Sequence, residues 1–201
     1  MPMKIEWFGH SCFRINESLV IDPYQDGSVP GLPNLRVSAN KVICSHQHAD
    51  HNGADCVKIV PGDDSAFAIT EIPSWHDNQQ GALRGPNTIF VIKCENLRVA
   101  HLGDLGCKLD DTQKRQLQNL DILMIPVGGF FTIDADQAAS IAKELKPKCI
   151  IPMHFRGDGF GYDVLGTVDL FAKHFTDARE VGAALEVSNA LPEVAVMDFA
   201  K

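Results

Sequence analysis

The chain has 201 residues, of which 45% are hydrophobic, with a net charge of -8 and a pI of about 5.4. We expect residues 1–201 to form a single domain, because this length and apolar content suffice for one substantial core. Asp and Glu outnumber Lys and Arg, and the basic residues form no continuous run. These features argue against nucleic-acid partners and against a basic helix on a membrane surface. No apolar run approaches the roughly 20 residues of a membrane span, and the N-terminus does not resemble a signal peptide. We therefore expect a cytoplasmic protein.

The first half of the chain predicts mainly short strands. Segments rich in β-branched and aromatic residues, separated by turn residues, are typical of strands. They cover 3–9, 11–16, 18–23, 41–45, 57–60 and 66–73. A hairpin turn is expected at 15–18, a short helix at 51–57, and loops at 26–34 and 74–87, where Gly, Pro and polar residues accumulate.

The second half alternates strands with helices. Strands are expected at 88–94, 97–103, 121–127, 148–154, 181–187 and 193–199, and helices at 110–120, 134–147 and 168–175. Pro147 ends the second of these helices. Because the strands are nearly all apolar, helices must cover their sheets. The sequence therefore predicts an α/β protein with two mixed β-sheets and helices on the outer faces.

The segment KVICSHQHADHNGAD, residues 41–55, contains three of the eight histidines in the chain. Random placement would produce the pattern H-x-H-x-D-H in roughly one such chain in a thousand. His46 and His48 follow a strand in extended backbone, so their rings point to one side and can reach one metal. Asp50 and His51 lie at the following turn, which redirects them. The four side chains could therefore serve two metals; surface histidines of a polar loop are the alternative.

Three more candidate donors stand at the ends of expected strands: His76, Asp104 and His154. A catalytic metal site needs ligands from elsewhere and an open position, whereas four local ligands alone are close to a closed structural zinc site. Strands that end in metal-binding residue types at one edge describe a site at a sheet margin.

The sequence resembles the metallo-β-lactamase-fold hydrolases. The matching pieces are LVIDP, SHQHADH, WHD, HLGD and PMH, which occur in the order of that family. The resemblance is closest to the small single-domain branch that includes ascorbate-6-phosphate lactonases. It rests on WFGHSCFRI, HDNQQGALRGPNTIFVI, HLGDLG, IPVGGFFTIDADQAA and IIPMHF. It implies a four-layer αβ/βα sandwich with the active site at one edge.

The resemblance also implies a set of ligands for two divalent metal ions. One ion is assigned to His46, His48 and His76, the second to Asp50, His51 and His154, and Asp104 bridges them. Asp22 supports these ligands without binding metal. The ions are expected to be Zn, with Mn or Fe also compatible with mixed imidazole and carboxylate ligands. Asp50 is the expected catalytic residue, because it can hold a hydroxide shared by the ions.

Four residues are candidates for contact with substrate: His10, Arg84, Asn87 and Arg156. The arginines lie on loops beside the expected site and can clamp a phosphate or carboxylate, although solvated loop cations are the alternative. For His10, the alternative to substrate contact is a buried, hydrogen-bonded position.

Two more residues lie near the candidate donors in sequence. Strand alternation places His101 opposite Asp104, which favours a structural role. Cys107 is the one thiol that could lie near the metals, since it follows Asp104 by three residues.

These observations favour a binuclear metal-dependent hydrolase acting on a small, anionic ester, lactone or phosphoester. The expected partner is this small-molecule substrate, and homo-oligomerisation stays open. The alternative is a non-catalytic metal-dependent sensor or scaffold on the same fold. Open metal positions and a water-filled cleft would favour the enzyme.

Overall fold

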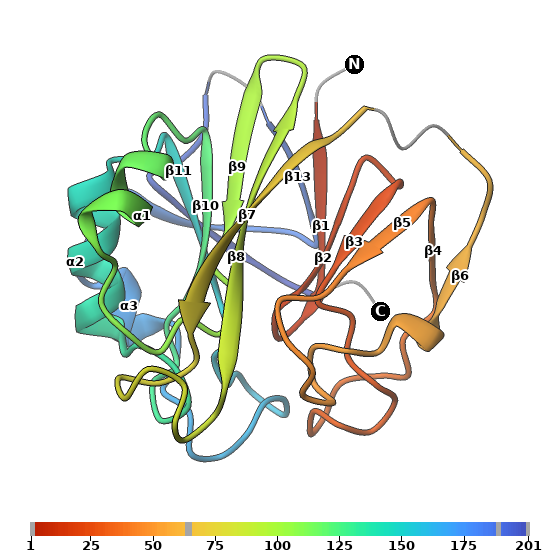
Figure 1. Cartoon of the computed structure of the whole chain (residues 1–201), viewed down its shortest axis with the longest axis horizontal. Coiled ribbons are helices and arrows are strands. Elements are labelled where there is room, and N and C mark those ends of the chain that lie inside the picture. The colour runs from red at the N-terminus through yellow and green to blue at the C-terminus, as the bar shows by residue number, and fades with distance from the viewer. Residues whose placement is uncertain (1–2, 63–65, 188–189, 200–201) are drawn as a thin grey trace.

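The computed structural model describes residues 3–62, 66–187 and 190–199. Two β-sheets face one another as the inner layers of a sandwich (Figure 1). Large apolar side chains from both sheets meet between them, including Trp7, Phe13, Ile89, Ile122 and Ile151. This arrangement confirms the expected α/β fold with two mixed sheets. Within the described ranges, no helix combines the length and apolar character needed to cross a membrane.

The first sheet has the strand order β13-β1-β2-β3-β5. Its strands are β1 (Lys4–Gly9), β2 (Cys12–Ile15), β3 (Leu19–Ile21), β5 (Lys41–Ile43) and β13 (Ala184–Glu186). The expected hairpin turn joins β2 to β3, and both of its central residues have positive φ, 50° at Asn16 and 58° at Glu17. Two such residues form the tight turn whose twist matches antiparallel strands. Strand β5 then runs parallel to β3 and delivers the chain to the histidine-rich segment.

The second sheet has the order β12-β14-β11-β10-β9-β8-β7. Its strands are β7 (Ala68–Trp75), β8 (Pro86–Cys94), β9 (Leu97–His101), β10 (Ile122–Pro126), β11 (Cys149–Met153), β12 (Ala178–Val181) and β14 (Val194–Met197). Strands β9, β10 and β11 run parallel, so their carboxyl ends meet at one edge. The β7–β8 hairpin extends two residues further at each strand than the sequence indicates, because Ser74 and Trp75 pair with Asn87 and Pro86.

Three helices lie beside the second sheet (Figure 1): α1 (Asp111–Gln116), α2 (Ala135–Leu145) and α3 (Asp169–Ala172). Capping boxes begin α1 at Asp110, which accepts the N–H groups of Thr112 and Gln113, and α2 at Asp134, which accepts that of Gln137. Helix α2 ends at a left-handed Lys146, directly before Pro147, as the sequence predicts. Helix α3 is shorter than the expected helix over 168–175.

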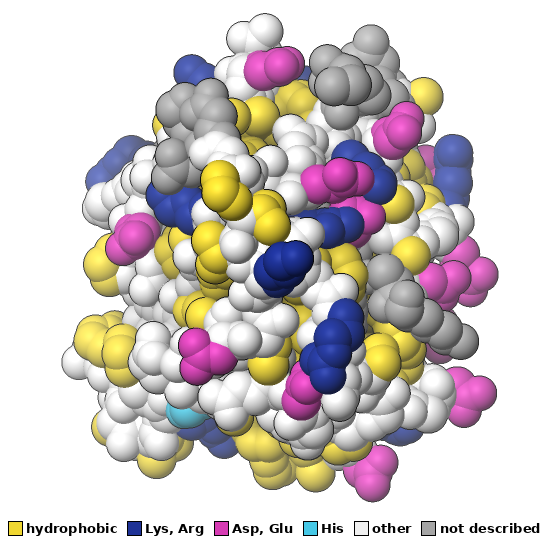
Figure 2. Space-filling model, turned by 90° about the vertical axis from the view of Figure 1, so that its right-hand side faces the viewer, with side chains coloured by type: hydrophobic (Ala, Val, Ile, Leu, Met, Phe, Trp, Pro, Cys, Tyr) yellow, Lys and Arg dark blue, Asp and Glu magenta, His cyan; other side chains and the backbone are white. Residues whose placement is uncertain are grey.

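The outer side of the first sheet differs from the expectation of helices on both outer faces. In the described part of the chain, the covering elements there are a parallel pair, β4 (Val37–Ala39) and β6 (Val57–Ile59), a 3-10 turn η1 (Ala54–Cys56) and the preceding loop. A second apolar cluster, which includes Cys12, Val20, Tyr24, Leu35 and Val37, fills this layer. The Gly- and Pro-rich sequence before β4 prevents a helix here. Figure 2 views this side, where basic and acidic side chains are interspersed.

Candidate metal centre

Loops that follow four strands bring the seven expected donors to one edge of the sandwich. Four donors follow β5 of the first sheet, and His76, Asp104 and His154 follow β7, β9 and β11 of the second. The turn between β9 and Asp104 requires glycine at Gly103, where φ is +55°. A Cβ there would lie 2.3 Å from Oδ1 of Asn87 and 2.6 Å from Cβ of Ser45. The close approach of these segments holds Asp104 against the histidines.

The first donor set consists of His46, His48 and His76, whose ligand atoms all lie within 4.8 Å of one another. The Nδ1–H of His76 donates to the Phe131 carbonyl at 3.1 Å, so its Nε2 keeps a lone pair. The Nδ1 of His46 lies 2.9 Å from Oγ of Ser45. Because that hydroxyl donates to a carboxylate of Asp22, its oxygen accepts from His46, whose Nε2 is also left as a lone pair. Such partners fix ring orientation in metal sites.

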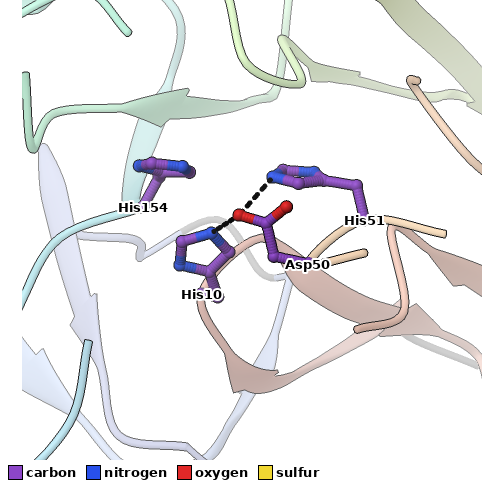
Figure 3. Close-up of side chains that lie close together, drawn as sticks. All are labelled: His10, Asp50, His51 and His154. Atoms are coloured by element: carbon purple, nitrogen blue, oxygen red, sulfur yellow. Dashed lines mark hydrogen bonds and ion pairs between the residues drawn. The ribbon is translucent and has the colours of Figure 1, made fainter. Parts of the chain in front are cut away.

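The second donor set consists of Asp50, His51 and His154, together with His10 (Figure 3). Oδ2 of Asp50 lies 3.2 Å from Nε2 of His10 and 4.0 Å from Nε2 of His51. The His10 ring also packs against that of His154, with centroids 4.0 Å apart. His10 is therefore buried among the donors, with 1% exposure, and is hydrogen-bonded to Asp50.

Asp104 lies between the two sets. Its Oδ2 is 3.0 Å from Nε2 of His76 and 3.1 Å from Nε2 of His154, and its Oδ1 is 3.1 Å from Nε2 of His51. The Asp104 backbone N–H donates to Oδ1 of Asn87 at 2.9 Å, which fixes the carboxylate from behind. One carboxylate therefore reaches donors of both sets.

Buried polar atoms at the centre lack hydrogen-bond partners within the described residues: Nε2 of His46, Nε2 of His51, both ring nitrogens of His154 and Oδ1 of Asp104. Several lie close together but not in hydrogen-bond geometry. Each such atom costs about 1–3 kcal/mol when buried without a partner. Imidazole nitrogens and carboxylate oxygens at this density match the donors that divalent transition metals prefer, so the residues fit a metal centre.

Asp22 lies behind the donors, where it contacts Ser45 and His51. Its carboxylate accepts the Ser45 N–H and hydroxyl, both at 2.6 Å, and Nδ1–H of His51 at 2.8 Å. Burial raises the pKa of Asp22, but the charge of His51 and its hydrogen bond outweigh burial and lower it. The carboxylate is therefore ionised and aims Nε2 of His51 at Asp104.

The protonation states favour cation binding. Burial, followed by repulsion from His51, lowers the pKa of His46 to about 3, so this ring is neutral at physiological pH. Burial opposes ionisation of Asp104, yet the charges of His154 and His51 bring its pKa well below the usual value. Burial also opposes the charge on His51, but Asp104 and Asp22 raise its pKa. The carboxylates of Asp104 and Asp22 thus stabilise positive charge at His51. In the metal-free protein a proton supplies this charge, and a bound cation would replace it.

The other expected site residues have different surroundings. Asn87 is 1% exposed, and its amide hydrogen-bonds to the Ser74 hydroxyl, the Leu102 carbonyl and the Asp104 backbone N–H, so it positions Asp104. Nε of Arg156 donates to the Leu165 carbonyl at 2.7 Å, on a neighbouring loop. Arg84 is half-buried, with its guanidinium 5.6 Å from the Phe131 ring centroid.

His101 and Cys107 lie outside the donor sets found among the described residues. The ring of His101 donates through Nε2 to the Ser11 carbonyl and accepts through Nδ1 from the Gly103 N–H, which is a structural role. Cys107 lines a neighbouring cavity.

Sequence reasoning did not assign a site role to Ser45. The Tyr162 hydroxyl lies 3.5 Å from Oδ2 of Asp50 and donates to the Ser28 carbonyl at 2.7 Å. Burial raises its pKa to about 12, and the nearby Asp50 charge adds to this, so it stays protonated. The position of Ser45 directly before the first histidine was the one available signal in the sequence.

Comparisons with known proteins agree with this geometry. A family model described as a beta-lactamase superfamily domain matches residues 4–154. The chain is similar to a UPF0173 metal-dependent hydrolase of Natranaerobius thermophilus (28% identical, covering 76% of this chain and 83% of the relative) and to one of Pelotomaculum thermopropionicum (29%, covering 92% and 95%). It is also similar to a Thermotoga maritima structure described as a Zn-dependent hydrolase of the metallo-β-lactamase superfamily, with 33% identity, a TM-score of 0.76, and coverage of 98% of this chain and 100% of that one. The chain therefore belongs to the metallo-β-lactamase superfamily.

Proposed function

We propose that the protein is a binuclear metal-dependent hydrolase. One observation carries the proposal: the donors from four strand ends form two sets, and Asp104 reaches both, because it groups with His46 of the first set and His51 of the second. Relatives named metal-dependent hydrolases support the reaction class.

Each donor set would hold one divalent ion. The first ion is assigned to His46, His48 and His76, the second to Asp50, His51 and His154, and Asp104 to both. Zinc suits these donors, and Mn or Fe are the alternatives. When bound, a pair of divalent ions supplies Lewis acidity and makes hydroxide available from water near neutral pH.

Asp50 is the proposed catalytic residue. Burial opposes its ionisation, but the hydrogen bond from His10 and the charge of His51 keep its pKa below the usual value. The carboxylate is therefore ionised and can accept a hydrogen bond from the attacking water, which orients that water. The His10 hydrogen bond holds the carboxylate in that orientation. The side chain of Asp50 is 17% exposed, whereas that of Asp104 is 2% exposed, so Asp50 is the more accessible of the two carboxylates.

The proposed substrate is a small anionic ester, lactone or phosphoester. Support comes from Arg84, whose guanidinium makes no hydrogen bond or ion pair with the described residues and is free to bind an anion. Long-range steering cannot favour an anion, because the protein carries a net charge of -8.

The test combines metal analysis with a hydrolysis screen. The reconstituted protein should bind about two equivalents of metal and hydrolyse at least one compound in a panel of phosphodiesters, lactones and thioesters. His48→Ala should lower the metal count and abolish hydrolysis, while His174→Ala, on the exposed His174–Asp136 pair, should change neither. A wild type that cannot be loaded beyond one equivalent would defeat the binuclear site. Full loading without turnover of any compound would favour the sensor or scaffold instead.

A further inference from the structure

A cavity of about 720 Å³ lies next to the metal centre. The loops after β7, β9 and β10 and one face of α2 form its walls. The residues that matter below are Arg84, Lys108, Phe130, Phe131 and Ser140. None of them belongs to a donor set. The proposed function uses only Arg84 among them, so the rest of the cavity has no role assigned above.

One wall of the cavity is built by a buried carboxylate. Oδ1 of Asp77 accepts the N–H groups of Gln79 and Gly81 at 2.7 and 3.0 Å, and Oδ2 accepts those of Leu83 and Arg84 at 3.0 and 2.8 Å. This cap fixes the β7–β8 loop and the backbone of Arg84. Because backbone donors surround the carboxylate, the charge of Asp77 is satisfied within the loop.

The cavity carries unbalanced positive charge. Lys114 forms an ion pair with Glu144 at 2.8 Å, so those two charges compensate one another. The side chains of Arg84 and Lys108 make no hydrogen bond or ion pair with any described residue. Two cations that line one cavity without a partner, in a protein of net charge -8, favour an anionic occupant.

The cavity also has an aromatic wall. The Arg84 guanidinium lies over the Phe131 ring at 5.6 Å, and the Phe130 ring packs edge-on against Phe131 at 4.8 Å. Phe130 is 64% exposed and has a φ of 60°. A bulky residue in left-handed backbone is disfavoured, and such positions are concentrated at binding sites. An exposed ring held this way offers a flat apolar surface beside the cations.

Phe131 connects the cavity to the metal centre. Its carbonyl accepts Nδ1–H of His76, and its ring lies 6.5 Å from the ring of His154. The same side chain lines the cavity. A molecule with its reacting bond at the donors could therefore extend past Phe131 into the cavity.

We propose that this cavity binds the non-reacting part of the substrate, a planar apolar group that carries a phosphate or carboxylate. Arg84 and Lys108 bind the anion, and Phe130 and Phe131 pack against the planar group. The identification of the occupant with the substrate rests on the hydrolase proposed above, whereas the affinity of the cavity for a planar anion does not.

Equilibrium binding of phenyl phosphate to the metal-loaded protein, measured by calorimetry, tests the proposal. Arg84→Gln should weaken binding by at least about tenfold, the loss expected for a charge-assisted hydrogen bond. Ser140→Phe, which fills the cavity from an exposed position on α2, should also weaken it. Ser140→Ala keeps the space open, and Lys173→Ala removes an exposed cation outside the cavity, so both should bind as wild type does. Metal analysis and thermal unfolding confirm that each variant is loaded and folded.

The choice of probe separates the cavity from the metals. Phenyl phosphate should bind more tightly than inorganic phosphate, because the metals can hold phosphate alone but the aromatic wall acts only on the ring. Benzoate tests whether a carboxylate replaces the phosphate. Equal affinity for phenyl phosphate and inorganic phosphate, or full affinity in both Arg84→Gln and Ser140→Phe, would overturn the proposal.

The outcomes also separate this proposal from the hydrolase itself. If the cavity binds phenyl phosphate as described but no compound is hydrolysed, the proposed function fails and the anion site stands. If hydrolysis is found but Arg84→Gln and Ser140→Phe leave KM unchanged for an aryl anionic substrate, the cavity inference fails and the hydrolase stands.

Discussion

Replacing Asp22 with asparagine would show how the protein controls the tautomer of His51. Asp22 adopts a left-handed backbone with φ of 47°, which asparagine also tolerates, so the substitution preserves the fold locally. The carboxylate accepts two bonds from Ser45 and one from Nδ1–H of His51. An asparagine has one acceptor oxygen and one NH₂ group, so it cannot accept all three.

The expected loss follows from where the NH₂ group lies. If the amide oxygen keeps the Ser45 N–H, the NH₂ group faces His51 and donates to its Nδ1. The ring proton then moves to Nε2, the atom that lies 3.1 Å from Oδ1 of Asp104. A protonated Nε2 has no lone pair for a cation. Loss of such a supporting contact lowers metal affinity by about 10–100-fold, or about 1.4–2.8 kcal/mol.

Competition with a chromophoric chelator measures this affinity for wild type and Asp22→Asn. Ser45→Ala is a comparison of a different kind, because it removes a partner of both Asp22 and the His46 ring but leaves the group that faces His51 unchanged. Thermal unfolding of both metal-free variants shows whether they remain folded. Affinity of Asp22→Asn within twofold of wild type, at both metal equivalents, would refute the tautomer argument.

The neighbouring histidines give three more tests. His10→Ala should weaken metal binding by about tenfold or more, because Asp50 loses its hydrogen-bond partner. His10→Gln keeps an N–H donor for Asp50 and should therefore lose less affinity. Equal losses of affinity in chelator competition would make His10 a ligand instead. His76→Ala should lower the metal content in elemental analysis. His101→Ala should not, because backbone groups are bonded to both ring nitrogens of His101. Metal loss in His101→Ala but not in His76→Ala would contradict the assignment. The urea midpoint of metal-free protein should fall as the pH drops from 6.5 toward 4. The pKa values of His46, about 3, and His10, about 4, lie below the unfolded value of 6.5, so the unfolded chain binds more protons in this window. A midpoint that is flat or rises toward acid would refute this.

The local part of the candidate site could be predicted from the sequence. His46, His48, Asp50 and His51 lie within six positions, so backbone geometry alone brings them together. His154 could be anticipated because it ends an apolar strand, and parallel strands present their carboxyl ends at one edge.

Contacts between distant segments could not be read from the chain in this way. His10 follows Gly9 in a short turn, and its approach to His154 depends on how the two sheets pack. Asn87 looked like a loop residue because Gly and Pro precede it, but pairing with Ser74 places it inside β8. The strand β4 has only three residues, too few for a periodic pattern, and exists through its pairing with β6.

The donors come from both layers of the sandwich, and this division affects more than chemistry. His46, His48, Asp50 and His51 follow β5 of the first sheet, whereas the remaining donors follow strands of the second. Bound ions would therefore link the two sheets to one another along one edge. A ligand that binds the folded chain alone adds about 4 kcal/mol to its stability when present at a thousand times Kd. The separation of the sheets, and with it the lifetime of the folded protein, would then depend on the concentration of free metal around it.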